Sequence, residues 1–210
     1  VAVEHGTKTI LATPHRRDVA ENSSVSEVQD IQRRLSGELE SRGIEIDLLL
    51  GMENHLDLDL PEDLSTGHAL PINGTRYVLV ELPFFGYPNY VEEILFQLQL
   101  QGSTPVLAHP ERIEAIQRNP GRLAEFVDRG MLTQITAGSI LGHFGGGVKR
   151  FTLSLLRKGL VHIIASDTHA PTGNRSPALP SGVAKAASIV GEERARAMVV
   201  DTPMAILNGQ

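Results

Sequence analysis

The stretch PVLAHPER, residues 105–112, joins a short apolar run to a histidine and a charged turn. Its aliphatic start predicts a buried strand, and the polar residues that follow mark the end of that strand. The same order recurs along the chain, where each apolar run is followed by a segment with helical spacing. We therefore expect strands alternating with helices, which is typical of a parallel sheet covered on both faces.

The alternation extends from one end of the sequence to the other. The predicted strands are residues 7–13, 44–51, 76–82, 104–108, 132–137 and 160–166. The predicted helices are residues 25–42, 90–101, 120–129, 148–158 and 182–190, and residues 170–181 are expected to form a long loop. A glycine, the usual residue at the end of a helix before a short loop, follows four of these helices: Gly43, Gly102, Gly130 and Gly159. The pair Asn73-Gly74 predicts a hairpin turn before the third strand. Such a strand count fits either a barrel that lacks a piece or an open doubly wound sheet.

Length and composition exclude several classes of function. A chain of 210 residues suits one domain, and its net charge of −6 without a basic run argues against a nucleic-acid partner. The absence of cysteine excludes thiolate catalysis, disulfides and a cysteine-bound zinc site. No signal peptide or bilayer-spanning run is visible, so we expect a cytoplasmic protein without membrane insertion.

Residues that bind metals follow the predicted strands. Five of the six runs end in such residues: His15, Glu53, Glu81, His109 and Asp167, the last followed closely by His169. In a β/α barrel the carboxyl ends of the strands meet at one mouth, so these side chains would converge there. One histidine after a strand is ordinarily a loop residue, and one glutamate is ordinarily solvated. Their joint recurrence favours a metal site, whereas His5, His55, His68, His143 and His162 lack the pattern and are interpreted as structural or surface residues.

Five motifs carry a family resemblance: TPHRR (13–17), GMENHLD (51–57), YVLVELP (77–83), PVLAHPER (105–112) and VHIIASDTH (161–169). Together they resemble the polymerase-and-histidinol-phosphatase (PHP) superfamily, and within it the metal-dependent protein tyrosine phosphatases of bacterial capsule and exopolysaccharide loci. The resemblance covers essentially the whole chain. It implies an α/β fold, a distorted seven-stranded (β/α) TIM-like barrel of the PHP type, in one domain over residues 1–210.

The same resemblance implies roles for particular residues. The implied metal ligands are His15, Glu53, Glu81, His109, Asp167 and His169. Arg112 and Arg175 match arginines that contact the substrate phosphate, although each by itself would pass for an ordinary surface residue. The expected cofactor is Mn²⁺, with Fe or Zn as alternatives, and the complete family site holds two to three ions. The resemblance also implies that residues 1–6 follow a missing first strand with an H-x-H motif, so we expect the N-terminus to be incomplete.

The sequence leaves three hypotheses for the function. The leading hypothesis is metal-dependent hydrolysis of protein phosphotyrosine, with Phe85 of the aromatic loop 83–90 packing on the substrate ring or, alternatively, closing the end of the core. The second is hydrolysis of a small phosphate ester such as histidinol phosphate, or a nuclease-like phosphoesterase activity, against which the lack of a basic stripe weighs. The third is a non-catalytic regulatory module that keeps the fold. The implied partner is a membrane-associated tyrosine kinase with a phosphotyrosine-bearing tail.

Overall fold

The computed structural model describes residues 1–177 and 179–210. These residues form two compact units. The N-terminal unit consists of Val1–Glu81, Asn89–Pro105 and Gly209, and the C-terminal unit consists of Leu82–Pro88, Val106–Asn208 and Gln210. The expectation of a single domain over residues 1–210 stays a prediction.

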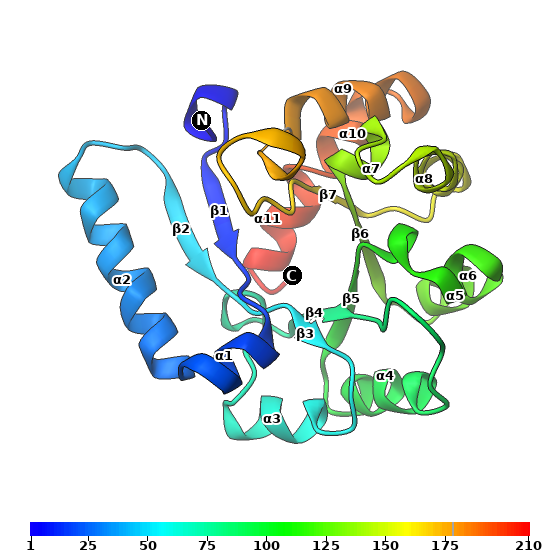
Figure 1. The fold of residues 1–210 in the computed structure, drawn as a ribbon, viewed down its shortest axis with the longest axis horizontal. Coiled ribbons are helices and arrows are strands. Elements are labelled where there is room, and N and C mark those ends of the chain that lie inside the picture. Colours follow the sequence, from blue (N-terminus) through cyan, green and yellow to red (C-terminus); the bar gives the residue numbers. More distant parts are fainter. Residues whose placement is uncertain (178) are drawn as a thin grey trace. The chain divides into compact units, whose positions relative to one another are not determined.

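The N-terminal unit contains short parallel strands with helices between them (Figure 1). Its elements are η1 (Val3–His5), β1 (Thr9–Ala12), α1 (Arg16–Asn22), α2 (Val25–Ser41), β2 (Asp47–Leu50), β3 (Asn54–His55), α3 (Leu60–Thr66), η2 (Ile72–Gly74), β4 (Tyr77–Glu81) and α4 (Val91–Leu100). Strand β1 pairs in parallel with β2, from Thr9 opposite Asp47 to Ala12 opposite Leu50. Strand β3 pairs in parallel with β4, which brings His55 opposite Glu81.

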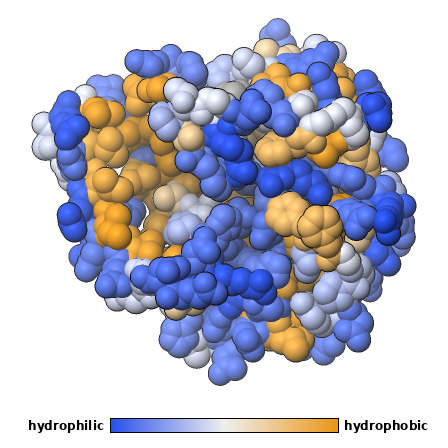
Figure 2. Space-filling view, in the orientation of Figure 1, coloured by the Kyte–Doolittle hydropathy of each residue, from blue (hydrophilic) through white to orange (hydrophobic). Residues whose placement is uncertain are grey.

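Helix α2 begins at a serine cap and leaves an apolar face in solvent. The hydroxyl of Ser24 accepts a hydrogen bond from the Glu27 N–H, and hydrogen bonds from Ser23 and Ser24 lower the pKa of the Glu27 carboxyl. No residue of α2 is buried, and Ile31 and Leu35 remain 50% and 46% exposed. Figure 2 shows hydrophobic side chains gathered around a hollow in the region where Figure 1 places α2 and β2.

The C-terminal unit contains a parallel ladder covered by helices. Its elements are β5 (Thr104–Ala108, which begins in the other unit), η3 (Pro110–Arg112), α5 (Glu114–Arg118), α6 (Gly121–Asp128), β6 (Leu132–Thr136), α7 (Ala137–Leu141), α8 (Gly146–Lys158), β7 (Ile163–Ala165), η4 (Gly173–Arg175), α9 (Leu179–Val190), α10 (Glu192–Ala197) and α11 (Asp201–Leu207). Strand β6 lies between β5 and β7 and pairs in parallel with both. Helix α9 contacts α7, α8, α10 and β7, so these helices form one cluster beside the ladder (Figure 1).

The central strands are buried because their sequences are almost wholly aliphatic. Val78, Leu79 and Val80 of β4 are at most 2% exposed, and Val106 and Leu107 of β5 are fully buried. Burying such side chains is the main favourable term in folding. The candidate ligands stand at or just after the ends of the strands, where these aliphatic runs give way to polar residues.

The structure confirms the expected parallel α/β organisation but corrects three details. The predicted hairpin at Asn73-Gly74 is wrong, because the pair lies in η2 with Asn73 at φ 49°, and the next strand, β4, has a registered parallel partner in β3. The predicted loop 170–181 is too long, because α9 already begins at Leu179; residue 178 lies outside the described residues. The predicted barrel is not confirmed, because strand pairing in the described part of the chain closes no ring. Across the same residues no helix combines the length and apolarity needed to cross a bilayer.

A close approach between α9 and α7 makes one glycine necessary. A Cβ built on Gly182 would lie 2.6 Å from the Ala137 Cβ and 2.9 Å from its Cα. We expect Gly182→Ala to lower the free energy of unfolding by about 1–3 kcal/mol, since the two helices would have to separate.

The matched control is Gly37→Ala in α2, where nothing lies within 4 Å of the added Cβ. This change should raise the free energy of unfolding by about 0.5–1 kcal/mol, because alanine suits a helix interior better than glycine. Urea unfolding of both variants measures the two effects. Equal stability of Gly182→Ala and the wild-type protein would contradict the packing described for α9.

Candidate functional site

In the N-terminal unit, a backbone bridge brings His15 and Glu53 together. The two residues form an isolated parallel β-bridge, in which the Arg16 N–H donates to the Glu53 carbonyl (3.0 Å) and the Glu53 N–H donates to the Pro14 carbonyl (3.1 Å). The bridge places His15 Nε2 at 3.7 Å from Glu53 Oε1. Glu53 is only 6% exposed, so its carboxylate requires a positive or polar environment.

The spacing between these side chains suits ligands of a cation. A separation of 3.7 Å is too long for a hydrogen bond, whereas metal–ligand bonds of about 2.0–2.2 Å bring two ligands of one ion to about 3–3.5 Å from each other. The other ring nitrogen of His15, Nδ1, lies 3.2 Å from Asp18 Oδ2. A carboxylate on the second nitrogen is the usual support of a metal-binding histidine, because it fixes which nitrogen faces the metal.

Glu81 lies beside Glu53, and His55 lies beside Glu81. One carboxylate oxygen of Glu81 is within 4.8 Å of one of Glu53, and His55 Nδ1 is 3.6 Å from Glu81 Oε2. Two carboxylates this close repel each other unless a cation or a proton lies between them. His55 was interpreted together with the structural histidines, although its position so near Glu53 distinguished it from the others. Its position two residues after Glu53 could have found it, because alternate residues of an extended strand point to the same side.

Arg16 holds the surroundings of this group in place. Its side chain is 8% exposed and forms ion pairs with Asp57 and Asp63, and its Nη2 donates to the His55 carbonyl (3.2 Å). These contacts join the start of α1 to β3 and α3. This role could not be predicted from the sequence, because the two aspartates lie 41 and 47 residues away along the chain.

In the C-terminal unit, Asp167 is the centre of a group of cations. Arg112 Nη1 donates to Asp167 Oδ2 (2.9 Å), and Arg175 Nη2 donates to Asp167 Oδ1 (3.2 Å). The Asp167 side chain is 10% exposed, so both ion pairs lie in a partly desolvated place. The predicted ligand His169 joins the group, with its Nδ1 at 2.6 Å from Arg175 Nη2.

His109 follows β5 at a strained turn and packs on an aromatic ring. It is 2% exposed, and its imidazole stacks on the Phe84 ring with centroids 5.5 Å apart and an angle of 9° between the planes. The backbone φ of His109 is 33° and that of Asp167 is 49°, in the left-handed region that residues with a Cβ seldom adopt. Such strain, about 1–3 kcal/mol per residue, persists where the surrounding structure imposes it, and functional sites are the usual place.

Phe144 is a member of this group that the sequence analysis missed. The Arg112 guanidinium carbon lies 4.5 Å from the Phe144 ring centroid and 5.1 Å from the Phe84 centroid. Arg175 approaches the same Phe144 ring at 5.9 Å. Each contact within about 6 Å adds a cation–π attraction, so two phenylalanines orient the guanidinium groups. Phe144 does not follow a strand, so the strand-end pattern in the sequence does not include it.

A buried glutamate ties this turn to the next helix. Glu111 is fully buried, and its Oε1 accepts hydrogen bonds from the Thr136 N–H (2.9 Å) and the Thr136 hydroxyl (3.3 Å). Burial raises the pKa of Glu111, against the hydrogen bonds from Ser139 and Thr136, which lower it. The Thr136 hydroxyl also caps α7 through the Ser139 N–H. The residues between His109 and Arg112 are thereby fastened to the end of β6.

Phe85 and four of the histidines that were interpreted as structural or surface residues lie outside the two groups of candidate site residues. Phe85 is 85% exposed, so it is not a core residue. His162 fits its structural interpretation: its Nδ1 accepts a hydrogen bond from the Thr133 N–H (3.1 Å), and burial, followed by the charge of Arg194, lowers its pKa. His5, His68 and His143 are exposed.

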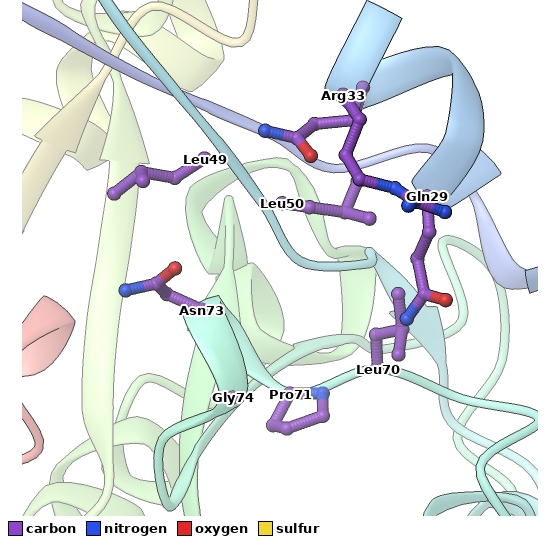
Figure 3. A pocket seen from close by; sticks show the side chains of 9 residues that line it. Gln29, Arg33, Leu49, Leu50, Leu70, Pro71, Asn73 and Gly74 are labelled. Carbon is purple, nitrogen blue, oxygen red and sulfur yellow. The ribbon is translucent and has the colours of Figure 1, made fainter. Parts of the chain in front are cut away.

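A cavity in the N-terminal unit lies among other residues. It has a volume of about 380 Å³ and is lined by side chains such as Gln29, Leu50 and Asn73 (Figure 3). None of His15, Glu53 or Glu81 belongs to its lining. The candidate metal ligands of this unit therefore lie at the strand ends and not in this cavity.

Comparison with known proteins identifies relatives over the whole chain. The family described as "Capsular polysaccharide synthesis, CpsB/CapC" matches residues 1–208. Tyrosine-protein phosphatase YwqE of Bacillus subtilis (strain 168) is 38% identical over 168 residues, which are 80% of this chain and 66% of YwqE. Tyrosine-protein phosphatase CpsB of Streptococcus pneumoniae is 28% identical over 219 residues, 98% of this chain and 86% of CpsB. The match thus spans slightly less than two thirds of the length of YwqE.

A solved structure matches the fold closely. It is described as "Crystal structures of YwqE from Bacillus subtilis and CpsB from Streptococcus pneumoniae, unique metal-dependent tyrosine phosphatases". The TM-score is 0.90 and the identity 33%, and the match covers 100% of this chain and 84% of that chain. The fold of this chain therefore closely matches that of the solved structure.

The buried ion pairs of Arg16 yield a stability prediction. Arg16→Met would leave the Asp57 and Asp63 carboxylates without their shared cation, and we expect it to lower the free energy of unfolding by about 3 kcal/mol. Denaturant unfolding at neutral pH measures the change.

Arg17→Met is the matched control, because the Arg17 side chain is 57% exposed and its Nη2 lies 3.7 Å from Asp57 Oδ2. An exposed pair of this kind contributes less than about 1 kcal/mol. Similar losses in the two variants would show that Arg16 does not hold α1 against β3 and α3.

Proposed function

Because this chain belongs to the CpsB/CapC family of capsular polysaccharide synthesis, we propose that it is a metal-dependent phosphatase that hydrolyses phosphotyrosine on proteins. YwqE and CpsB are tyrosine-protein phosphatases by name, and the matching structure is described as metal-dependent. The observation that carries the proposal is the position of Arg112 and Arg175 on Asp167, next to His169. Two guanidinium groups beside candidate metal ligands suit a phosphate ester. The reaction would serve the control of capsular or exopolysaccharide synthesis.

We further propose that residues of each unit are metal ligands. The proposed ligands are His15, Glu53, Glu81, His109, Asp167 and His169. Support comes from their shared place after strands, from the short spacings within each unit and from family membership. The finer fold proposal is the distorted seven-stranded barrel of the PHP type, in which strand ends converge at a mouth. The match of the whole chain at a TM-score of 0.90 supports it.

Mn²⁺ is the proposed cofactor, with two to three ions in the complete site and Fe or Zn as alternatives. Carboxylate oxygens and imidazole nitrogens suit all three metals, and the partly buried carboxylates Glu53 and Glu81 supply the negative charge that cations require. Bound divalent ions would supply Lewis acidity toward the phosphoryl group and lower the pKa of a bound water.

The chain's own residues would bind and orient the substrate. Arg112 and Arg175 would donate paired N–H groups to the phosphoryl oxygens, which stabilises the negative charge during transfer. Phe84 and Phe144 would keep the Arg112 guanidinium in its plane. Phe85, which extends into solvent, would pack on the tyrosyl ring of the substrate.

The proposed partner is a phosphotyrosine-bearing protein, specifically the tail of a membrane-associated tyrosine kinase. The proposed location is the cytoplasm. Family membership supports both, because a phosphatase of capsule synthesis would act where such a tail is exposed. Neither nucleic acid nor insertion in a membrane is part of the proposal.

The direct test is phosphate release from a phosphotyrosyl peptide in the presence of Mn²⁺. We expect release that a chelator abolishes, and much slower release from a phosphoseryl peptide and from histidinol phosphate. The metal requirement follows from the proposed carboxylate and imidazole ligands, and the absence of cysteine excludes a phosphocysteine route. Faster turnover of histidinol phosphate than of the phosphotyrosyl peptide would instead favour a small-molecule phosphatase.

A conservative change tests the proposed arginine contact. Arg112→Lys keeps the charge but loses the planar pair of donors and the stacking between two rings, so we expect kcat/KM for the phosphotyrosyl peptide to fall about tenfold or more. Arg150→Lys, an exposed position on α8, is the control and should leave kcat/KM unchanged. Full activity of Arg112→Lys would remove Arg112 from the phosphate site.

A further inference from the structure

A second cavity lies in the C-terminal unit, beside the loop that carries Phe84. It has a volume of about 210 Å³ and is bounded by Tyr87 from that loop and by Glu114, Arg118 and Arg122 from α5 and α6. Its floor includes Ala115, so the interior is small and largely apolar. None of the proposed metal ligands lines it.

The charges at this cavity are unbalanced in favour of cations. The Arg122 guanidinium carbon lies 3.9 Å from the Tyr87 ring centroid, and no carboxylate pairs with Arg122 among residues 1–177 and 179–210. Arg118 Nη2 pairs with Glu114 Oε1 at 2.5 Å, but the two side chains are 77% and 41% exposed. An exposed pair four residues apart on a helix is weak and exchanges readily. Two arginines therefore face one glutamate, in a chain whose net charge is −6.

One loop of the chain connects the cavity with the proposed substrate site. Phe84 stacks on His109 and contacts Arg112, and the Phe84 carbonyl accepts a hydrogen bond from the Glu114 N–H (3.3 Å). Tyr87 follows three residues later and forms a wall of the cavity. Phe84 and Tyr87 are three residues apart, so their Cα atoms are separated by at most about 10 Å. Two residues of a substrate peptide that are three positions apart can span the same distance.

We propose that this cavity is a subsite for an acidic side chain of the substrate polypeptide, within three residues of the phosphotyrosine. The carboxylate pairs with Arg122, which the Tyr87 ring holds in place, and Arg118 adds a second positive charge at the rim. The methylene groups of the acidic side chain cover the apolar floor. The subsite rests on the proposed phosphotyrosine hydrolysis and adds a preference for the residues that flank the phosphotyrosine.

The test compares the affinities of paired peptides. Each peptide carries a non-hydrolysable phosphotyrosine analogue and either Glu or Gln at one position within three residues of it, and fluorescence anisotropy measures binding to the metal-loaded protein. We expect the wild-type protein to prefer Glu by about two- to fivefold at the best position, the size of an exposed ion pair. Arg122→Gln should bind the Glu and Gln peptides equally.

Arg157→Gln, an exposed arginine of α8, is the matched control and should keep the preference for Glu. Equal affinity of wild-type protein for the Glu and Gln peptides at every position, or binding of neither, would overturn the subsite. So would an unchanged preference in Arg122→Gln. Hydrolysis of free phosphotyrosine, which has no flanking residue, should be the same in Arg122→Gln and wild-type protein. Absence of this hydrolysis in the wild-type protein would count against the proposed function and not against the subsite.

Discussion

Buried carboxylates need positive charge close to them, and in each unit of the chain the candidate site is built around this requirement. A carboxylate removed from water loses its hydration and must recover that free energy from a cation or from hydrogen-bond donors. In the N-terminal unit, Glu53 and Glu81 face imidazoles at 3.7 and 3.6 Å. In the C-terminal unit, Asp167 faces two guanidinium groups. Imidazoles leave room for a metal ion between ligands, whereas the arginines offer donors to a phosphate.

The surrounding structure keeps these groups in position against local strain. His109 and Asp167 both adopt positive φ angles, which cost free energy that packing must offset. The Glu111 contacts with Thr136 fasten the turn after His109, and the Arg16 ion pairs fasten the segment after His15. The turns after His15 and His109 therefore each have a buried ionic or hydrogen-bonded anchor next to them. Such support is what an active site needs, because small displacements of a ligand are costly for catalysis.

The sequence predicted the elements whose signals are local. Aliphatic runs and glycines at helix ends identified the long helices and six of the strands, and the strand-end rule selected His15 and Glu53, which the structure brings together. Short elements such as β3 and α7 were missed, because five residues or fewer carry too little periodicity. Arg16 and Phe144 were missed for another reason: their roles depend on contacts with residues far away in the sequence. The Asn73-Gly74 pair does adopt the positive φ angles of a tight turn, 49° and 69°, but the strand that follows it pairs in parallel, so the turn does not join a hairpin.

The most direct measurement is the affinity for Mn²⁺ of three proteins: the wild-type chain, Glu81→Gln and Asp167→Asn. Glu81 belongs to the N-terminal unit and Asp167 to the C-terminal unit, and titration calorimetry gives the number and strength of the bound ions. If Glu81 and Asp167 are both metal ligands, each substitution should weaken Mn²⁺ binding about tenfold or more, with both proteins still folded. Wild-type Mn²⁺ affinity in either variant would contradict the assignment of the substituted residue as a metal ligand.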